Sequence, residues 1–319
     1  MDRKQERQWN GKSRGGSFGY LFFVFILKVF GIRFAYAVLA AVVFHFLLFA
    51  PKAVRAIWAY NRKRLGYGRM KSAVELYRHF YVFGQTLIDR MALRAGLQHK
   101  YRFEFENYDR FIEVISNSGV VMMGAHVGCW DAGSVFFGAY GKKINIVMFD
   151  AEHERIKKVL EKNGCGANYK IIAVNKGSVE AMVQIKLALD KGEYVCFNAD
   201  RYVDGKATFA AEFLDGEVLL PDGPFRIVAR CRMPVFFYYA MREKKRTYRF
   251  IFIEATPGEV KDEKKLVERY VDSLERIVRS YPRQWFNFYH FWNKPRRRPS
   301  LPEVCRGENR EAKSYRPKK

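Results

Sequence analysis

Residues 120–131, Val-Val-Met-Met-Gly-Ala-His-Val-Gly-Cys-Trp-Asp, join a buried-strand pattern to two polar residues suited to catalysis. The four apolar residues at the start predict a buried strand, which Gly124 ends. If a helix begins near His126, Asp131 lies about one turn further along and its carboxylate can bind one imidazole nitrogen. The other nitrogen can then take a proton from a hydroxyl group. The alternative is a polar residue at a strand end, followed by an acidic residue that the helix dipole favours in a first turn.

The glycines of this stretch, Gly124 and Gly128, let the backbone approach whatever His126 touches. Backbone N–H groups at a helix start are good donors to a negative charge. We therefore expect the N–H groups of this turn to stabilise an oxyanion that develops next to His126.

Strand-like and helix-like patterns alternate from about residue 101 onwards. Such alternation predicts an α/β fold, with a mixed, partly parallel sheet flanked by helices. The expected strands are residues 103–105, 120–123, 144–149, 169–174, 194–197, 235–239 and 249–253, and the expected helices are residues 69–98, 131–139, 152–162, 178–191, 224–231 and 262–281.

The net charge of +24 is concentrated at the two ends of the chain. Residues 1–64 contain twelve Lys and Arg against two acidic residues, and residues 294–319 contain ten against three. Such an excess predicts an anionic partner, which could be nucleic acid, an acidic protein or an acidic membrane surface. Because the N-terminal charges are interleaved with very apolar sequence, the pattern favours a membrane surface over nucleic acid.

The segment 34–50 is the most continuous apolar stretch, with His45 as its only polar residue. Its 17 residues lie at the lower limit for crossing a bilayer. A signal peptide is disfavoured because cationic residues, and no small-residue cleavage site, follow the segment. A single span, a helical hairpin, an interfacial anchor and an ordinary buried helix all remain open. The Lys and Arg residues beyond the segment favour a cytosolic location for the rest of the chain.

Asp200 and Arg201 follow the expected strand 194–197, at the edge where open α/β sheets carry their sites. The alternative is a surface loop with a local ion pair. Further on, Gly223 lies at an expected helix start with Arg226 and Arg230 nearby, which predicts a site for phosphate or carboxylate. The alternative there is a capped amphipathic helix with two solvent-exposed arginines.

Two other features are less decisive. The segment 282–292, Pro-Arg-Gln-Trp-Phe-Asn-Phe-Tyr-His-Phe-Trp, is strongly aromatic and suits either a core or a membrane interface. The five cysteines are scattered, which is typical of a reducing compartment and not of a disulfide framework or zinc module.

Several classes of catalytic or cofactor site have no motif here. The chain has no Gly-x-Gly-x-x-Gly, Walker or Gly-x-Ser-x-Gly pattern, so a nucleotide cofactor and a serine triad lack support. The only support for a metal site is the weak cluster of His126, Asp131, Asp150 and His153. We expect no metal and no cofactor.

Together these residues resemble the lysophospholipid acyltransferase superfamily, and within it the late lipid A (lauroyl/myristoyl) acyltransferases of Gram-negative bacteria. The Gln-Trp-Phe-Asn-Phe motif at 284–288 is typical of this branch, whereas the Phe-Pro-Glu-Gly-Thr block of glycerol-phosphate acyltransferases is absent. The resemblance is carried by the N-terminal apolar segment, Gly124–Asp131, Asn198–Arg201, Phe213–Gly216, Gly223–Arg230, Met233-Pro234 and Gln284–Tyr289.

The resemblance implies a glycerolipid acyltransferase-like fold and a membrane-bound O-acyltransferase. His126 would be the general base and Asp131 its orienting partner, and the region 223–230 would help to bind the acceptor phosphate or the acyl donor. The donor would be an acyl carrier protein thioester and the acceptor a lipid A precursor. The corresponding domains are a flexible basic arm (1–17), a membrane anchor (18–64), the acyltransferase domain (65–293) and a basic tail (294–319).

One departure affects the acceptor. Many lipid A enzymes have an Arg-Pro and Asn-rich stretch where this chain has Phe149-Asp-Ala-Glu-His-Glu154. The resemblance implies lipopolysaccharide synthesis at the inner membrane, and an amino-acid lipid or a lysophospholipid is the alternative acceptor. Two other classes of function also remain, namely a non-enzymatic binder of anionic lipid or nucleic acid and a metal-assisted hydrolase.

Overall fold

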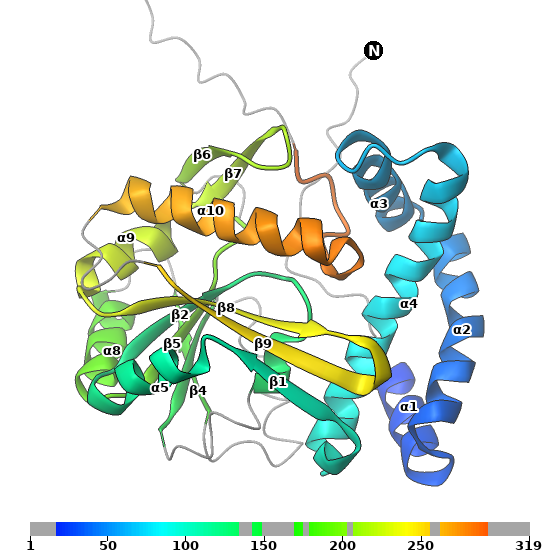
Figure 1. Ribbon diagram of the computed structural model, residues 1–319, viewed down its shortest axis with the longest axis horizontal. Helices are drawn as coiled ribbons and strands as arrows, with labels where there is room; N and C mark the ends of the chain where they lie inside the picture. Colours follow the sequence, from blue (N-terminus) through cyan, green and yellow to red (C-terminus); the bar gives the residue numbers. More distant parts are fainter. Residues whose placement is uncertain are drawn as a thin grey trace, which may run out of the picture.

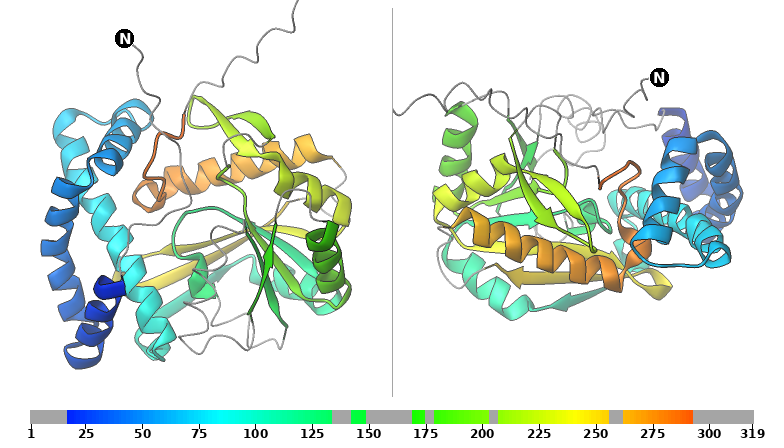
Figure 2. Two further views of the ribbon diagram at one scale, coloured as in Figure 1. Left: turned by 180° about the vertical axis from the view of Figure 1, so that it is seen from behind. Right: turned by 90° about the horizontal axis from the view of Figure 1, so that it is seen from above.

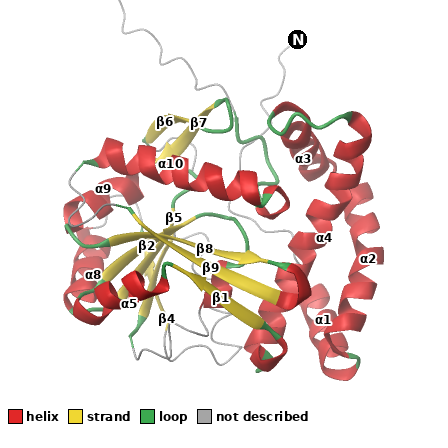
Figure 3. Ribbon diagram, in the orientation of Figure 1, coloured by secondary structure: helices red, strands yellow, loops and turns green. Residues whose placement is uncertain are grey.

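The computed structural model describes residues 17–133, 142–148, 169–174, 179–202, 207–255 and 262–292. Within them a seven-stranded mixed sheet has the strand order β1-β9-β8-β2-β5-β3-β4, and helices cover both of its faces (Figures 1 and 3). The mixed α/β fold predicted from the sequence is confirmed. The strands of the sheet are β1 (Arg102–Glu106), β2 (Val120–Gly124), β3 (Ile144–Met148), β4 (Tyr169–Ala173), β5 (Tyr194–Asn198), β8 (Val235–Arg242) and β9 (Thr247–Glu254).

Strand β2 lies in the middle of the sheet, parallel to β5 on one side and to β8 on the other. The register places Gly124 opposite Asn198, so β2 and β5 end at the same level. The residues that follow these two strands are therefore neighbours in space, although more than seventy positions separate them in the chain. Only β9 and β1 run in the opposite direction, because β8 and β9 form an antiparallel pair.

The two faces of the sheet are packed into two separate cores. Val121 and Met123 of β2 belong to one core, and Val120 and Met122 to the other, as expected for a strand whose side chains alternate between faces. Helices α8 (Val179–Asp190), α9 (Asp222–Cys231) and α10 (Glu263–Ser280) cover the first face, and α5 (Tyr108–Asn117) covers the second.

Four helices precede the sheet: α1 (Ser17–Val29), α2 (Gly31–Phe49), α3 (Pro51–Lys63) and α4 (Arg69–Arg94). Figure 2 shows α1, α2 and α3 at one end of the molecule, on the outer side of α4. Helix α2 is the one described helix long and apolar enough to cross a membrane. Its Leu39 packs so closely on α4 that a Cβ atom at Gly84 would lie 2.4 Å from it.

Some elements differ from the sequence prediction. A helix does not begin near His126, because Val127 forms an antiparallel bridge with Trp285 and the first helical turn, η2, covers Trp130–Gly133. The rest of the predicted helix 131–139 and the whole of 152–162 lie outside the described residues. Helix α5 and the hairpin of β6 (Thr208–Glu212) and β7 (Glu217–Pro221) were not predicted, since both are short and β6 is largely polar or small.

Candidate active site

His126 lies two residues beyond the end of β2, in a turn that the neighbouring strand β8 confines. Gly128 has a φ of +55°, and a Cβ atom there would lie 2.1 Å from the carbonyl oxygen of Ala240 in β8. Only glycine fits this conformation and this close approach. Gly128 therefore has a structural role, because it lets the turn pack against the sheet.

The carboxylate of Asp200 binds His126 at two points. Its Oδ1 lies 2.7 Å from Nδ1 of the imidazole, and its Oδ2 accepts a hydrogen bond of 3.1 Å from the His126 backbone N–H. Asp200 is fully buried at the end of β5, whereas the His126 side chain is 24% exposed. With Nδ1–H donating to the carboxylate, the neutral imidazole has its free lone pair on Nε2.

Asp200 is ionised at neutral pH. Burial alone would raise the pKa of this carboxyl, but the charge and hydrogen bonds of His126, together with the charge of Arg201, outweigh burial and hold the pKa below its usual value. The buried carboxylate fixes the orientation of the partly exposed imidazole and leaves Nε2 as the nitrogen that can accept a proton. This arrangement suits a general base.

The aromatic segment, residues 282–292, holds the same turn from its other side. The N–H of Phe286 donates to the carbonyl oxygen of His126 at 2.8 Å, and the N–H of Gly128 donates to that of Gln284 at 2.9 Å. Both bonds are between backbone atoms, so the segment acts as a short strand paired with the turn at His126. Trp285 between them is buried, and it places this part of the segment in the core.

Arg201 connects the aromatic segment to Asp200. Its guanidinium donates to Asn287 Oδ1 at 3.0 Å and to the carbonyl oxygen of Phe286 at 2.8 Å, and it lies over the ring of Tyr289. The Asn287 amide in turn lies 3.5 Å from Asp200 Oδ2. These contacts fix the segment beside the His126–Asp200 pair. A direct contact of Arg201 with substrate stays a prediction.

The backbone donors of the turn are already in use. The N–H groups of residues 126–129 donate, in order, to the Asp200 carboxylate at 3.1 Å and to the carbonyl oxygens of Ala125 at 2.8 Å, Gln284 at 2.9 Å and Ala240 at 2.8 Å. Each of these N–H groups has one proton to donate. The prediction that they stabilise an oxyanion is therefore wrong for these four residues.

Asp131, the partner predicted for His126, lies in η2, and its side chain is outside the described residues. The prediction for Asp131 is therefore untested, while Nδ1 of His126 is bound by Asp200. Asp150 and His153, named with them as a weak metal cluster, also lie outside the described residues. Among the residues that are described, no group of three or more His, Cys, Asp or Glu side chains could hold a metal ion.

Gly223, Arg226 and Arg230 lie on α9. The space next to Gly223 is open, since a Cβ atom there would meet nothing within 4 Å. Arg226 is half exposed and pairs with Asp222 at 3.2 Å and Glu263 at 3.8 Å. Arg230 is exposed in the last turn of α9. Among the described residues neither arginine forms a hydrogen bond or ion pair with His126, and their role with an acceptor phosphate stays a prediction.

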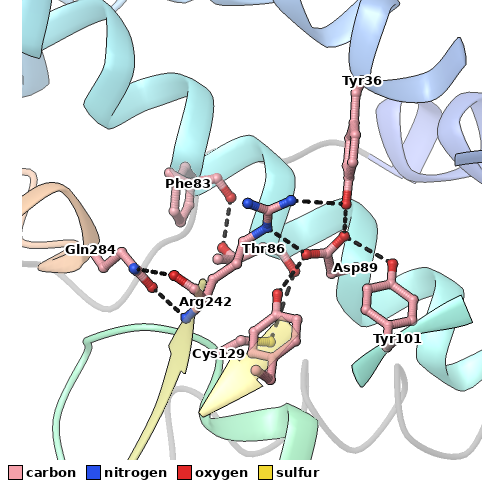
Figure 4. Close-up of polar contacts among 9 residues, drawn as sticks. Tyr36, Phe83, Thr86, Asp89, Tyr101, Cys129, Arg242 and Gln284 are labelled. Atoms are coloured by element: carbon pink, nitrogen blue, oxygen red, sulfur yellow. Dashed lines mark hydrogen bonds and ion pairs between the residues drawn. The ribbon is translucent and has the colours of Figure 1, made fainter. Parts of the chain in front are cut away.

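A second buried carboxylate, Asp89 of α4, was not singled out by the sequence. It accepts hydrogen bonds from Tyr36, from Tyr101 at 2.9 Å and from Tyr248 at 2.6 Å, and Arg242 Nε donates to it at 2.9 Å (Figure 4). These partners come from α2, from the residue before β1, and from β9 and β8. The cluster therefore joins the N-terminal helices to the sheet.

Arg242 also connects this cluster to the aromatic segment. The Gln284 side chain accepts from the Arg242 backbone N–H at 2.8 Å and donates to its carbonyl oxygen at 2.7 Å (Figure 4). The backbone carbonyl of Gln284 accepts the hydrogen bond from Gly128 in the turn at His126. The Gln284 side chain, bound to Arg242 at the end of β8, thus fixes where the aromatic segment meets His126.

The Phe213–Gly216 stretch is a turn between β6 and β7. Arg64, the residue after α3, donates to the carbonyl oxygen of Asp215 at 2.7 Å, and Glu275 accepts from the backbone N–H of Leu214 at 2.7 Å. A Cβ atom at Gly216 would lie 2.3 Å from the Arg64 guanidinium. The stretch therefore joins α3, the hairpin and α10, which is a structural role.

Comparison with known proteins gives one informative match. The model of the family described as bacterial lipid A biosynthesis acyltransferase matches residues 9–294 of the 319-residue chain. The match extends over α1 to α10 and the aromatic segment up to Trp292. No curated protein gives a significant match to this sequence.

Proposed function

Because the chain belongs to the bacterial lipid A biosynthesis acyltransferase family, we propose that it is a membrane-bound O-acyltransferase that moves a fatty acyl chain from a thioester to a hydroxyl of a lipid A precursor. The family makes the chain an acyltransferase that uses an acyl donor and a lipid acceptor. The observation that supports our assignment of the chemistry is the contact between His126 Nδ1 and the buried Asp200 carboxylate.

His126 acts as the general base in this proposal. Its Nε2 takes the proton of the acceptor hydroxyl while the oxygen attacks the thioester carbonyl, so a new C–O bond forms. The tetrahedral intermediate then collapses, the C–S bond breaks, and the proton on His126 passes to the departing thiolate. Asp200 stabilises the imidazolium between the two steps. General-base help of this kind contributes roughly 10² to 10⁴ in rate.

The acyl donor we propose is an acyl carrier protein thioester. The chain carries a net charge of +24, and electrostatic attraction to an acidic carrier would speed association. The same charge suits an anionic bilayer, and we place the enzyme at the inner membrane with its catalytic domain on the cytoplasmic side. Asp131, Gly223, Arg226 and Arg230 remain proposed site residues.

The departure at residues 149–154 supports a second acceptor class, an amino-acid lipid or lysophospholipid. Lipid mass spectrometry of a deletion strain separates the two. We expect one fatty acyl chain to be missing from lipid A. If lipid A is intact and an amino-acid lipid or phospholipid loses the acyl chain instead, the lipid A assignment is wrong.

His126→Ala is the direct test of the chemistry. We expect the variant to lose at least about a hundredfold in acyl transfer from acyl carrier protein thioester to a lipid A precursor, because the general base is gone. It should remain attached to membranes. His99→Ala is the matched control, since His99 is exposed in the turn η1 (Gln98–Lys100). Full activity of His126→Ala would show that His126 is not the general base, whereas the absence of acyl transfer in the unchanged chain would favour a binder without catalysis.

A further inference from the structure

Apart from Arg33 and His45, helix α2 is apolar around its circumference, but the protein covers only one of its faces. Ile32, Ala35, Leu39 and Val43 are buried at the spacing of a single helical stripe. The opposite stripe is open among the described residues. It contains Phe34, Ala37, Ala41, Phe44 and Leu48, and Phe22, Phe25 and Phe30 of the neighbouring segment are exposed as well.

The covered face of α2 is fixed along α4. Tyr81 of α4 donates to the carbonyl oxygen of Tyr36 at 3.3 Å, and Tyr77 donates to that of Ala40 at 3.1 Å. Together with the Leu39–Gly84 contact, these bonds hold the two helices antiparallel over the middle of α2. The pair therefore moves as one body with the catalytic domain.

Helix α4 is unsuited to the interior of a bilayer. Arg78, next to Tyr77 and so level with the centre of α2, has a side chain that is 53% exposed. Arg78 pairs with Glu75, and charged side chains are strongly disfavoured at the bilayer centre. The Asp89–Arg242 ion pair at the end of β8 lies beside Tyr36 and would also be brought to membrane depth. A spanning α2 would thus carry part of the sheet into the hydrocarbon.

We propose that α2 does not cross the membrane but lies in the plane of one leaflet, with the stripe from Phe34 to Leu48 in the lipid and α4 towards the cytoplasm. The partner is an anionic bilayer, because the exposed cations Lys28, Arg33 and Lys52 border the apolar stripe. Such a helix inserts about 5–10 Å into the headgroup and acyl boundary. This inference rests on the proposed membrane attachment and specifies its geometry.

Protease protection of tagged full-length chains tests the geometry. One epitope is placed before Met1 and another after Lys319, and both are followed in spheroplasts and in inverted membrane vesicles of a Gram-negative host. An in-plane helix leaves both tags on the cytoplasmic side, so both are protected in spheroplasts and digested in inverted vesicles. A spanning helix exposes the two tags on opposite sides, and that result would overturn the in-plane geometry while leaving the acyl transfer proposal intact.

A matched pair of variants tests the lipid contact. Phe44 is 60% exposed on α2, and Leu187 is 53% exposed on α8 at the other end of the molecule (Figure 1). We expect Phe44→Asp to weaken binding to phosphatidylethanolamine–phosphatidylglycerol vesicles roughly 10- to 100-fold, because burying such a side chain contributes about 1.5–3 kcal/mol. Leu187→Asp should bind like the unchanged chain.

Two outcomes of the vesicle experiment would count against the inference. If the unchanged chain does not bind vesicles, membrane attachment fails and the in-plane geometry fails with it. If Phe44→Asp binds vesicles normally but converts a dimer to a monomer, the stripe contacts a second copy of the chain. Acyl transfer measured on detergent-dispersed acceptor separates both outcomes from a failure of the enzyme assignment, since it does not depend on vesicles.

Discussion

Asp200 and Asp89 are two fully buried carboxylates beside the strands that flank β2, and they have opposite surroundings. Asp89 has three tyrosine hydroxyls and Arg242 around it, all of them fixed by surrounding elements. Asp200 binds the imidazole and backbone of His126, whose ring is partly exposed.

The comparison shows how one residue type serves two tasks. A carboxylate whose partners are buried or mostly buried fixes the positions of the elements that supply them, because breaking any one bond leaves the buried carboxylate with an unpaired oxygen. A carboxylate whose imidazole partner is partly exposed can instead stabilise the positive charge that forms on that ring during a reaction. We therefore expect Asp89 to serve the stability of the fold and Asp200 to serve the reactivity of His126.

The largest expected effect is on catalysis at Asp200. Asp200→Asn removes the charge that stabilises the imidazolium while keeping nearly the same shape, so we expect kcat for acyl transfer to fall roughly 10²- to 10⁴-fold. The variant should stay folded in a urea titration. A kcat within threefold or so of the unchanged enzyme would mean that Asp200 does not assist the base.

The matching change at Asp89 should act on stability instead. Asp89→Asn leaves Arg242 without its counter-charge, and we expect the free energy of unfolding to fall by about 3–5 kcal/mol. Enzyme that remains folded should keep a kcat near that of the parent, measured after removal of aggregates. Tyr101→Phe, which removes one hydroxyl from the same carboxylate, should cost only about 1 kcal/mol.

A third buried polar group, His79 of α4, predicts a pH dependence of stability. Burial lowers the pKa of His79 to about 4. A hydrogen bond with the Trp285 backbone and the charge of Glu75 act to raise this pKa, but burial outweighs them. As pH falls from about 6.5 to 4, the unfolded chain takes up a proton here that the folded chain does not. Folding stability should therefore fall by an amount on the order of 3 kcal/mol across this window.

His79→Gln should remove that share of the pH dependence, whereas His99→Gln, at an exposed position, should not. The measurement is the midpoint of urea unfolding between pH 4 and pH 7 for the three proteins. An identical slope in His79→Gln and the parent would show that burial does not hold His79 neutral.

The smallest expected effect concerns the acceptor. If α9 binds an acceptor phosphate, Arg226→Gln should raise KM for the acceptor a few-fold without changing kcat, because Arg226 is already shared with Asp222 and Glu263. Arg230→Gln, in the last turn of the same helix, tests the second predicted contact in the same assay. An unchanged KM in both variants would remove α9 from the acceptor site.

The sheet was largely predictable because its central strands are short, continuous apolar runs. Val120–Gly124, Tyr194–Asn198 and Val235–Arg242 all formed strands where the sequence indicated them. Helix α10 also begins where expected, with Asp262 accepting from the N–H groups of Lys264 and Lys265 as its N-cap. Apolar runs and helix caps are local patterns, and a single sequence shows local patterns directly.

The contacts of the site were less predictable. Asp200 was placed at the correct edge of the sheet, but its bond to His126 depends on β5 being the neighbour of β2, and the sequence does not state the strand order. The aromatic segment pairs with the turn at His126 through backbone atoms. Backbone contacts of this kind leave no pattern of side chains in the sequence. Asp89 could have been noticed as an acidic residue on the buried stripe of α4, beside Ile88 and Ala92.

The protonation of the His126 ring tests the central claim most directly. In protein labelled with ¹⁵N-histidine, we predict an Nδ1–H signal shifted far downfield by the Asp200 carboxylate, together with an unprotonated Nε2 in the neutral ring. Asp200→Asn should abolish the shift, and Asp131→Asn should leave it in place. A downfield signal that survives Asp200→Asn and disappears in Asp131→Asn would contradict the account.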